Sequence, residues 1–193
     1  MKPVFDVAFS GTSLTFNSSS LADVNGYWQP SARRELQKAS TAPVVFYDFG
    51  ISGATAQIIY DNRQTAINLH PTVAVIECGM NDAATSVTIA DFKFIITALI
   101  NAWKTGSPGT AIYLMTMNPA IAPAGAWKAN LPTYYQAIRD VAVLESVGLI
   151  DNHPLWGVPT STQIPIDGVH PTAIAARSIL VPKLLSVLSP LVA

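Results

Sequence analysis

Residues 73–82 read Val73-Ala74-Val75-Ile76-Glu77-Cys78-Gly79-Met80-Asn81-Asp82. The first part, Val73–Glu77, is rich in β-branched residues and apolar at alternate positions on both sides. This pattern is typical of a strand in a parallel sheet whose two faces are both covered. A glycine and two polar side chains follow the strand directly. The stretch therefore predicts a buried parallel strand that ends in a polar loop.

Runs of the same kind recur on both sides of this strand. We predict further strands at Val4–Phe9, Val44–Asp48, Ala111–Met117 and Leu149–Asn152. Segments with a helical period alternate with them, at Trp28–Ala39, Ala90–Thr105, Pro132–Val147 and Thr172–Val187. Such alternation is the signature of βαβ units. With right-handed crossovers it predicts a three-layer α/β/α sandwich around a five-stranded parallel sheet of order 2-1-3-4-5.

Length and composition narrow the class of protein. The chain has 193 residues, which predicts one domain spanning 1–193. Hydrophobic residues make up 50% and charged residues only 12%, which excludes a disordered chain. The formal net charge is −1 and no block of like charge occurs, so we expect no nucleic-acid partner. One cysteine excludes a disulfide scaffold, and three histidines argue against a His/Cys zinc cage. Oligomeric state stays open.

Apolar runs and the N-terminal residues bear on location. The longest strongly apolar run that we find, Phe94–Trp103, is far shorter than the roughly 20 residues that cross a bilayer. Residues 1–9 lack the long apolar segment and small-residue cleavage site of a signal peptide. We therefore expect no membrane span, and a cytoplasmic location by default. A secreted domain without its signal would have the same sequence pattern.

Groups suited to acyl transfer follow four of the five predicted strands. Ser13 stands in the turn after the first strand, Gly53 after the second, and Asn81 after the third. Asp167 and His170 follow the fifth, and a carboxylate three residues before a histidine can orient the imidazole. Taken singly, each is more often an ordinary turn or capping residue. Because parallel strands end at one edge of the sheet, we expect all five residues to meet there.

Three other residues compete for the same roles. His70 precedes the third strand and is expected at the opposite edge of the sheet, in a structural role. His153 follows the fifth strand on the correct edge, but it has no carboxylate three residues before it. Cys78 ends the third strand, and a free cysteine in such a place is commonly a core residue.

The ordered polar blocks resemble those of the SGNH (GDSL-type) hydrolases. The blocks that carry the resemblance are Gly11-Thr12-Ser13-Leu14, Gly53, Gly79-Met80-Asn81-Asp82 and Asp167-Gly168-Val169-His170-Pro171. Together they span nearly the whole chain. One position departs from the pattern, because the family's first block usually reads Gly-Asp-Ser-Leu and Thr12 replaces the acid. The Gly-x-Ser-x-Gly elbow of α/β-hydrolases is absent.

The resemblance implies a serine esterase acting by two-step acyl transfer. Ser13 would be the nucleophile, His170 the general base and Asp167 the residue that orients His170. The oxyanion hole would comprise the Ser13 N–H, the Gly53 N–H and the Asn81 side chain. No metal or organic cofactor is needed for this chemistry. The expected partner is a small-molecule or carbohydrate ester with a short acyl group.

Two other functions remain open at this stage. A non-catalytic module could keep the same scaffold to bind glycans or to serve in an assembly. A flavodoxin-like binder would have the same strand order, and its turn at 10–15 could hold a phosphate or flavin through hydroxyls and backbone N–H groups. The second alternative leaves Asp167 and His170 without a role.

Overall fold

Five parallel strands form the centre of the protein. The computed structural model describes residues 4–15, 28–165 and 167–192. The strands are β1 (Phe5–Gly11), β2 (Val44–Gly50), β3 (Val73–Glu77), β4 (Ala111–Thr116) and β5 (Gly148–Asp151). They pair in the order β2-β1-β3-β4-β5, and every pair is parallel. This confirms the sheet predicted from the sequence. The carboxyl ends of all five strands lie at one edge, where ligands bind in open sheets of this kind.

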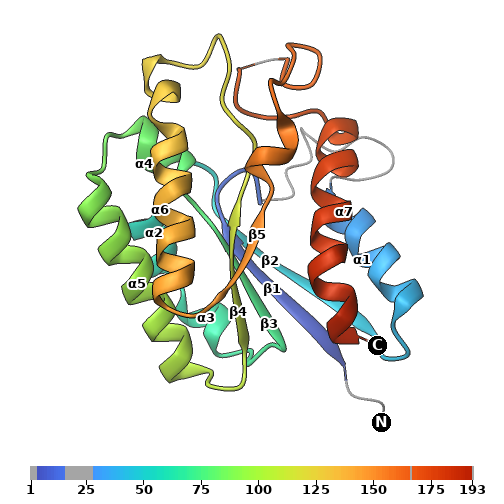
Figure 1. Cartoon of the computed structure of the whole chain (residues 1–193). Coiled ribbons are helices and arrows are strands. Elements are labelled where there is room, and N and C mark those ends of the chain that lie inside the picture. The colour runs from blue at the N-terminus through green and yellow to red at the C-terminus, as the bar shows by residue number, and fades with distance from the viewer. Residues whose placement is uncertain (1–3, 16–27, 166, 193) are drawn as a thin grey trace.

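Helices cover both faces of the sheet (Figure 1). They are α1 (Trp28–Ala39), α2 (Ala56–Asp61), α3 (Gln64–Ile67), α4 (Met80–Ala84), α5 (Ile89–Gly106), α6 (Leu131–Leu144) and α7 (Ala173–Val192). α1 packs against α7 on one face, while α5 packs against α2 and α6 on the other. The three-layer sandwich is thus confirmed. Its core holds large side chains that are fully buried, including Phe9, Trp28 and Trp103.

Helix boundaries follow local capping chemistry. The Thr88 side chain accepts a hydrogen bond from the Asp91 N–H at the start of α5, as the spacing predicts. Asn130 occupies the cap position of α6, but its side chain makes no capping hydrogen bond. The short helices α2, α3 and α4 were not predicted, because four to six residues are too few to show a helical period.

Helix α7 is longer than the sequence pattern indicated. It extends to Val192 although two prolines, Pro182 and Pro190, lie within it. Among the described residues it is the one helix that is long and apolar enough, by length and composition, to cross a membrane. The sequence pattern did not predict this, because polar residues interrupt its apolar runs. A third of its most apolar window is buried, and the helix packs against α1 and β5. It therefore belongs to one helical layer of the sandwich.

Candidate active site

Three of the predicted site residues form a continuous hydrogen-bonded chain. Ser13 Oγ lies 2.8 Å from His170 Nε2, and His170 Nδ1 lies 2.5 Å from Asp167 Oδ2. The serine follows β1, whereas the other two residues precede α7. The topology thus brings together groups that are 157 positions apart in the sequence. One imidazole ring joins a hydroxyl to a carboxylate, which is the arrangement that activates a serine.

The Asp167 carboxylate is held by its own loop. Its Oδ1 accepts hydrogen bonds from the Val169 N–H and the His170 N–H, both at 2.8 Å. Burial alone would raise the pKa of Asp167, but the hydrogen bonds from His170 and Val169 outweigh it and lower the pKa below its usual value. The lowered pKa favours the ionised carboxylate that faces the imidazole.

A neighbouring loop, residues 118–124, clamps the segment that carries His170. Asn118 Nδ2 donates to the Val169 carbonyl at 2.7 Å, and the Ile121 N–H donates to the Gly168 carbonyl at 2.8 Å. Gly168 has φ +73°, and a Cβ there would collide with the Ile121 carbonyl oxygen. Sequence reasoning did not find Asn118, whose only sequence signal is a polar residue just after a strand.

Gly53 and Asn81, the two other predicted oxyanion donors, stand beside each other but outside that chain. The Asn81 side-chain amide donates one hydrogen bond, 2.9 Å long, to the carbonyl of Ala54. Among the described residues, the backbone N–H groups of Ser13 and Gly53 donate no hydrogen bond. Gly53 has φ +75°. The Ile51 N–H donates to the Gly11 carbonyl at 2.9 Å, which ties the Gly53 loop to the Ser13 loop.

Asp82 fixes the two loops that carry these donors. Its Oδ1 accepts from the Ala56 N–H at 2.9 Å and its Oδ2 accepts from the Gly79 N–H at 3.1 Å. The side chain is fully buried. Burial, only partly offset by these hydrogen bonds, raises the pKa of Asp82. Asp82 thus acts as a structural bridge beside Asn81.

The competing residues lie in other surroundings. The His153 ring packs against Tyr135 at a centroid distance of 4.9 Å, and burial lowers the pKa of His153. His70 Nδ1 lies 3.2 Å from Ser107 Oγ, before β3, at the far edge of the sheet. Burial raises the pKa of the Cys78 thiol well above its usual value, which keeps it protonated and unreactive.

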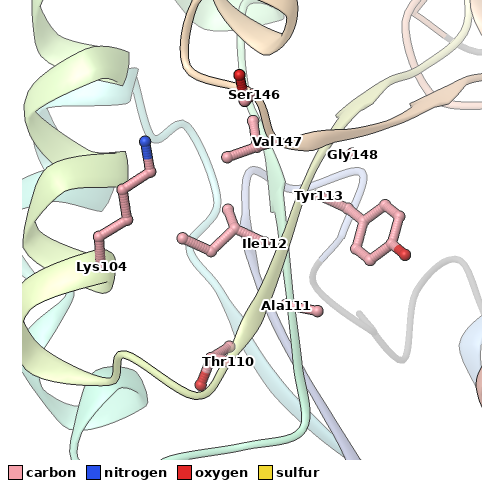
Figure 2. Close-up of a pocket in the computed structure, with 8 residues that line it drawn as sticks. All are labelled: Lys104, Thr110, Ala111, Ile112, Tyr113, Ser146, Val147 and Gly148. Carbon is pink, nitrogen blue, oxygen red and sulfur yellow. The ribbon is translucent and has the colours of Figure 1, made fainter.

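Other features of the described residues lie apart from this site. A pocket of about 320 Å³ opens among residues at the amino ends of β4 and β5, on the edge opposite Ser13 (Figure 2). Among the described residues, no group of three or more His, Cys, Asp or Glu side chains could hold a metal ion.

A comparison with protein-family models gives a match over most of the chain. The model of the GDSL-like lipase/acylhydrolase family matches residues 9–177. No curated protein sequence matches the chain significantly.

Solved structures with the same fold cover almost the whole chain. A lipase/acylhydrolase from Enterococcus faecalis has a TM-score of 0.80 at 16% identity, covering 97% of each chain. A psychrotrophic esterase from Pseudoalteromonas sp., inhibited by monoethylphosphonate, has a TM-score of 0.77 at 16% identity and covers 97% of this chain and 98% of its own. An acetylxylan esterase from Geobacillus stearothermophilus has a TM-score of 0.75 at 17% identity, covering 94% and 92%. With most of its length matched by the family model, the chain belongs to the GDSL-like lipase/acylhydrolase family.

Proposed function

We propose that the protein is a serine esterase that hydrolyses short-chain acyl esters through Ser13, His170 and Asp167. The observation that carries the proposal is the unbroken hydrogen-bonded chain from the Asp167 carboxylate through His170 to Ser13 Oγ. Membership of an acylhydrolase family supports the same class of reaction.

Acylation follows from this geometry. With its proton on Nδ1, facing Asp167, the His170 ring presents a free Nε2 lone pair to the Ser13 hydroxyl. Nε2 takes the hydroxyl proton as Oγ attacks the ester carbonyl, and the ionised Asp167 stabilises the imidazolium that forms. The imidazolium then gives its proton to the leaving alcohol, which leaves an acyl-Ser13. Water, activated by the same imidazole, releases the carboxylic acid.

The negative charge of each tetrahedral intermediate needs donors at the edge of the sheet. We assign this role to the Ser13 N–H, the Gly53 N–H and the second N–H of the Asn81 amide, whose first N–H is bonded to Ala54. A substituted side chain at 53 would also have to adopt φ +75°, which favours glycine.

Short acyl groups on a carbohydrate are the substrates we favour. The His170 side chain is 24% exposed and that of Asp167 is 44% exposed, so the reacting groups lie close to solvent. This exposure is compatible with a bulky leaving group that extends into solvent. Two of the structures with this fold are acetylxylan esterases, and that resemblance supports an O-acetyl carbohydrate as substrate.

A chain-length series tests this proposal. We expect kcat/KM for p-nitrophenyl acetate and butyrate to exceed that for the octanoate by about tenfold or more, because in a site for short acyl groups the added methylenes stay in water and contribute no binding free energy. Release of acetate from acetylated xylooligosaccharides, measured in parallel, tests the carbohydrate. A preference for octanoate would contradict the short-chain assignment.

Replacing Asn81 with alanine should lower kcat by a factor on the order of 10²–10³, the usual loss when one oxyanion donor is removed. KM should change little, because the donor acts mainly on the transition state. Steady-state kinetics on p-nitrophenyl acetate measure both constants. An unchanged kcat in a folded Asn81→Ala protein would remove Asn81 from the oxyanion hole.

Activity should fall on acidification as a single proton is taken up. A protonated His170 cannot accept the Ser13 proton, whereas the lowered pKa of Asp167 keeps its carboxylate ionised until more acidic pH. The acid limb of log(kcat/KM) against pH should therefore have a slope of one. A slope of two would show that a second group, such as Asp167, titrates in the same range.

The phosphate-binding alternative finds less support at the turn on which it depends. The hydroxyls of Thr12 and Thr15 both donate to the buried carboxylate of Glu77, at 2.7 and 3.0 Å. These hydroxyls are therefore engaged with an acid, and an acid beneath the turn disfavours a bound anion.

A further inference from the structure

Glu77, the last residue of β3, has no part in the mechanism above. Its side chain is fully buried. Three donors converge on one of its oxygens, Oε2: the Thr12 N–H at 2.9 Å, the Thr12 hydroxyl at 2.7 Å and the Thr15 hydroxyl at 3.0 Å. The other oxygen, Oε1, is buried without a hydrogen-bond partner among the described residues. The acceptor function of this side chain is thus concentrated on a single atom.

These donors stand on both sides of Ser13. Thr12 precedes the serine directly, and Thr15 follows it by two positions. The Thr12 hydroxyl, while donating to Glu77, accepts a hydrogen bond from the Leu14 N–H at 3.1 Å, and the Thr15 N–H donates to the Thr12 carbonyl at 3.1 Å. The turn that carries Ser13 is therefore held by internal hydrogen bonds and by hydrogen bonds to Glu77.

Gly11 lies so close to Glu77 and Thr15 that a larger residue would not fit there. A Cβ on Gly11 would lie 2.9 Å from Glu77 Oε2 and would collide with Thr15 Oγ1, so glycine lets the turn and the acid meet. Burial raises the pKa of Glu77, and the hydrogen bonds from Thr12 and Thr15 oppose that rise. Removing one partner would leave a buried donor or acceptor without a hydrogen bond, which would lower the free energy of unfolding.

We propose that Glu77 is a positioning residue that holds the Ser13 turn through Thr12, so that the Ser13 N–H and Oγ stand where catalysis needs them. This inference rests on the proposed esterase function. The family's first block usually has an aspartate where this chain has Thr12. In this chain the Thr12 hydroxyl donates to an acid at the end of β3. A misplacement of about 1 Å can cost on the order of 10²-fold in rate, so the attachment bears directly on kcat.

Matched variants separate positioning from stability alone. Thr12→Val removes the hydroxyl at constant shape, and Glu77→Met removes the acceptor at similar volume. Thr12→Ser and Glu77→Gln are the conservative partners, because each keeps the donor or the carbonyl acceptor. Thr116→Val is the control: that buried hydroxyl also donates to a carboxylate, that of Asp151 at 2.6 Å. It likewise accepts from backbone N–H groups, but it lies outside the site.

Four quantities should be measured for each protein: kcat and KM with p-nitrophenyl acetate, the rate of labelling by a fluorophosphonate followed by intact mass, and Tm. We expect Thr12→Val and Glu77→Met to lower both kcat and the labelling rate by tenfold or more, with KM within about threefold of wild type. The two conservative variants should stay within about fivefold in kcat. Thr116→Val should lose Tm but keep kcat.

Other outcomes overturn the inference. If Thr12→Val and Thr116→Val lose similar Tm and both keep kcat, Glu77 is only structural. If Glu77→Gln loses as much activity as Glu77→Met, an acceptor oxygen is not what Glu77 supplies. A failure of the proposed function shows separately, in the wild type, as no hydrolysis and no labelling at Ser13, and it removes the positioning role with it. Should Glu77→Met not fold, the two Thr12 variants still decide.

Discussion

Replacing Ser13 with alanine should lower the rate of p-nitrophenyl acetate hydrolysis by a factor of roughly 10⁴ or more. The methyl group offers no oxygen for the acyl intermediate, and His170 then has only water to activate. The loss should appear in kcat, while Tm stays close to that of the wild type because one exchanged hydrogen bond is worth only about 1 kcal/mol.

Ser178→Ala is the matched control. Ser178 is an exposed residue of α7 whose hydroxyl donates to the Ala175 carbonyl of the same helix. This variant, prepared identically, should retain full activity. Equal rates for wild type and Ser13→Ala would mean that the observed hydrolysis is background, and the non-catalytic module would become the better description.

Asp167→Asn should lower kcat by a factor of about 10⁴, although it changes no more than one atom type. The asparagine can keep its Oδ1 as acceptor for the Val169 and His170 N–H groups. Its amide nitrogen then faces His170 Nδ1 and donates to it. The imidazole proton moves to Nε2, which can no longer accept the proton of Ser13.

Steady-state kinetics and thermal unfolding together test this prediction. Because the loop retains its hydrogen bonds, Tm should change by only a few degrees. Asp140→Asn, at an exposed carboxylate that pairs with Lys93, should leave kcat unchanged. An Asp167→Asn protein with more than a tenth of the wild-type kcat would show that His170 needs no carboxylate to fix its tautomer.

Fold and order of strands could be predicted because their signals are local. Val73–Glu77 was predicted with its observed bounds, as was α1 at Trp28–Ala39. The ends of α6 and α7 were misplaced by a few residues, since their termini depend on packing more than on a strong cap. The fifth strand, predicted at Leu149–Asn152, begins one residue earlier at Gly148, which lies against the Tyr113 ring.

The polar residues of the candidate site could also be predicted from the sequence, but the residues that hold them in place could not. Ser13, Asp167 and His170 stand in motifs with a fixed spacing, and the strand order predicts that they meet. Glu77 was read as part of a strand, although one acid in an apolar run signals a buried partner. The hydrogen bonds from Asn118 to Val169 and from Ile121 to Gly168 could not be predicted, because they depend on how two distant loops pack.

The separation of Ser13 from His170 along the chain has a consequence for biosynthesis. His170, the general base that we propose, is translated 157 codons after Ser13. Asn118 and Ile121, which hydrogen-bond to Val169 and Gly168 in the folded protein, also precede them in translation. Under the proposed mechanism, a nascent chain therefore carries an inert serine until residues 167–170 have been synthesised and have docked.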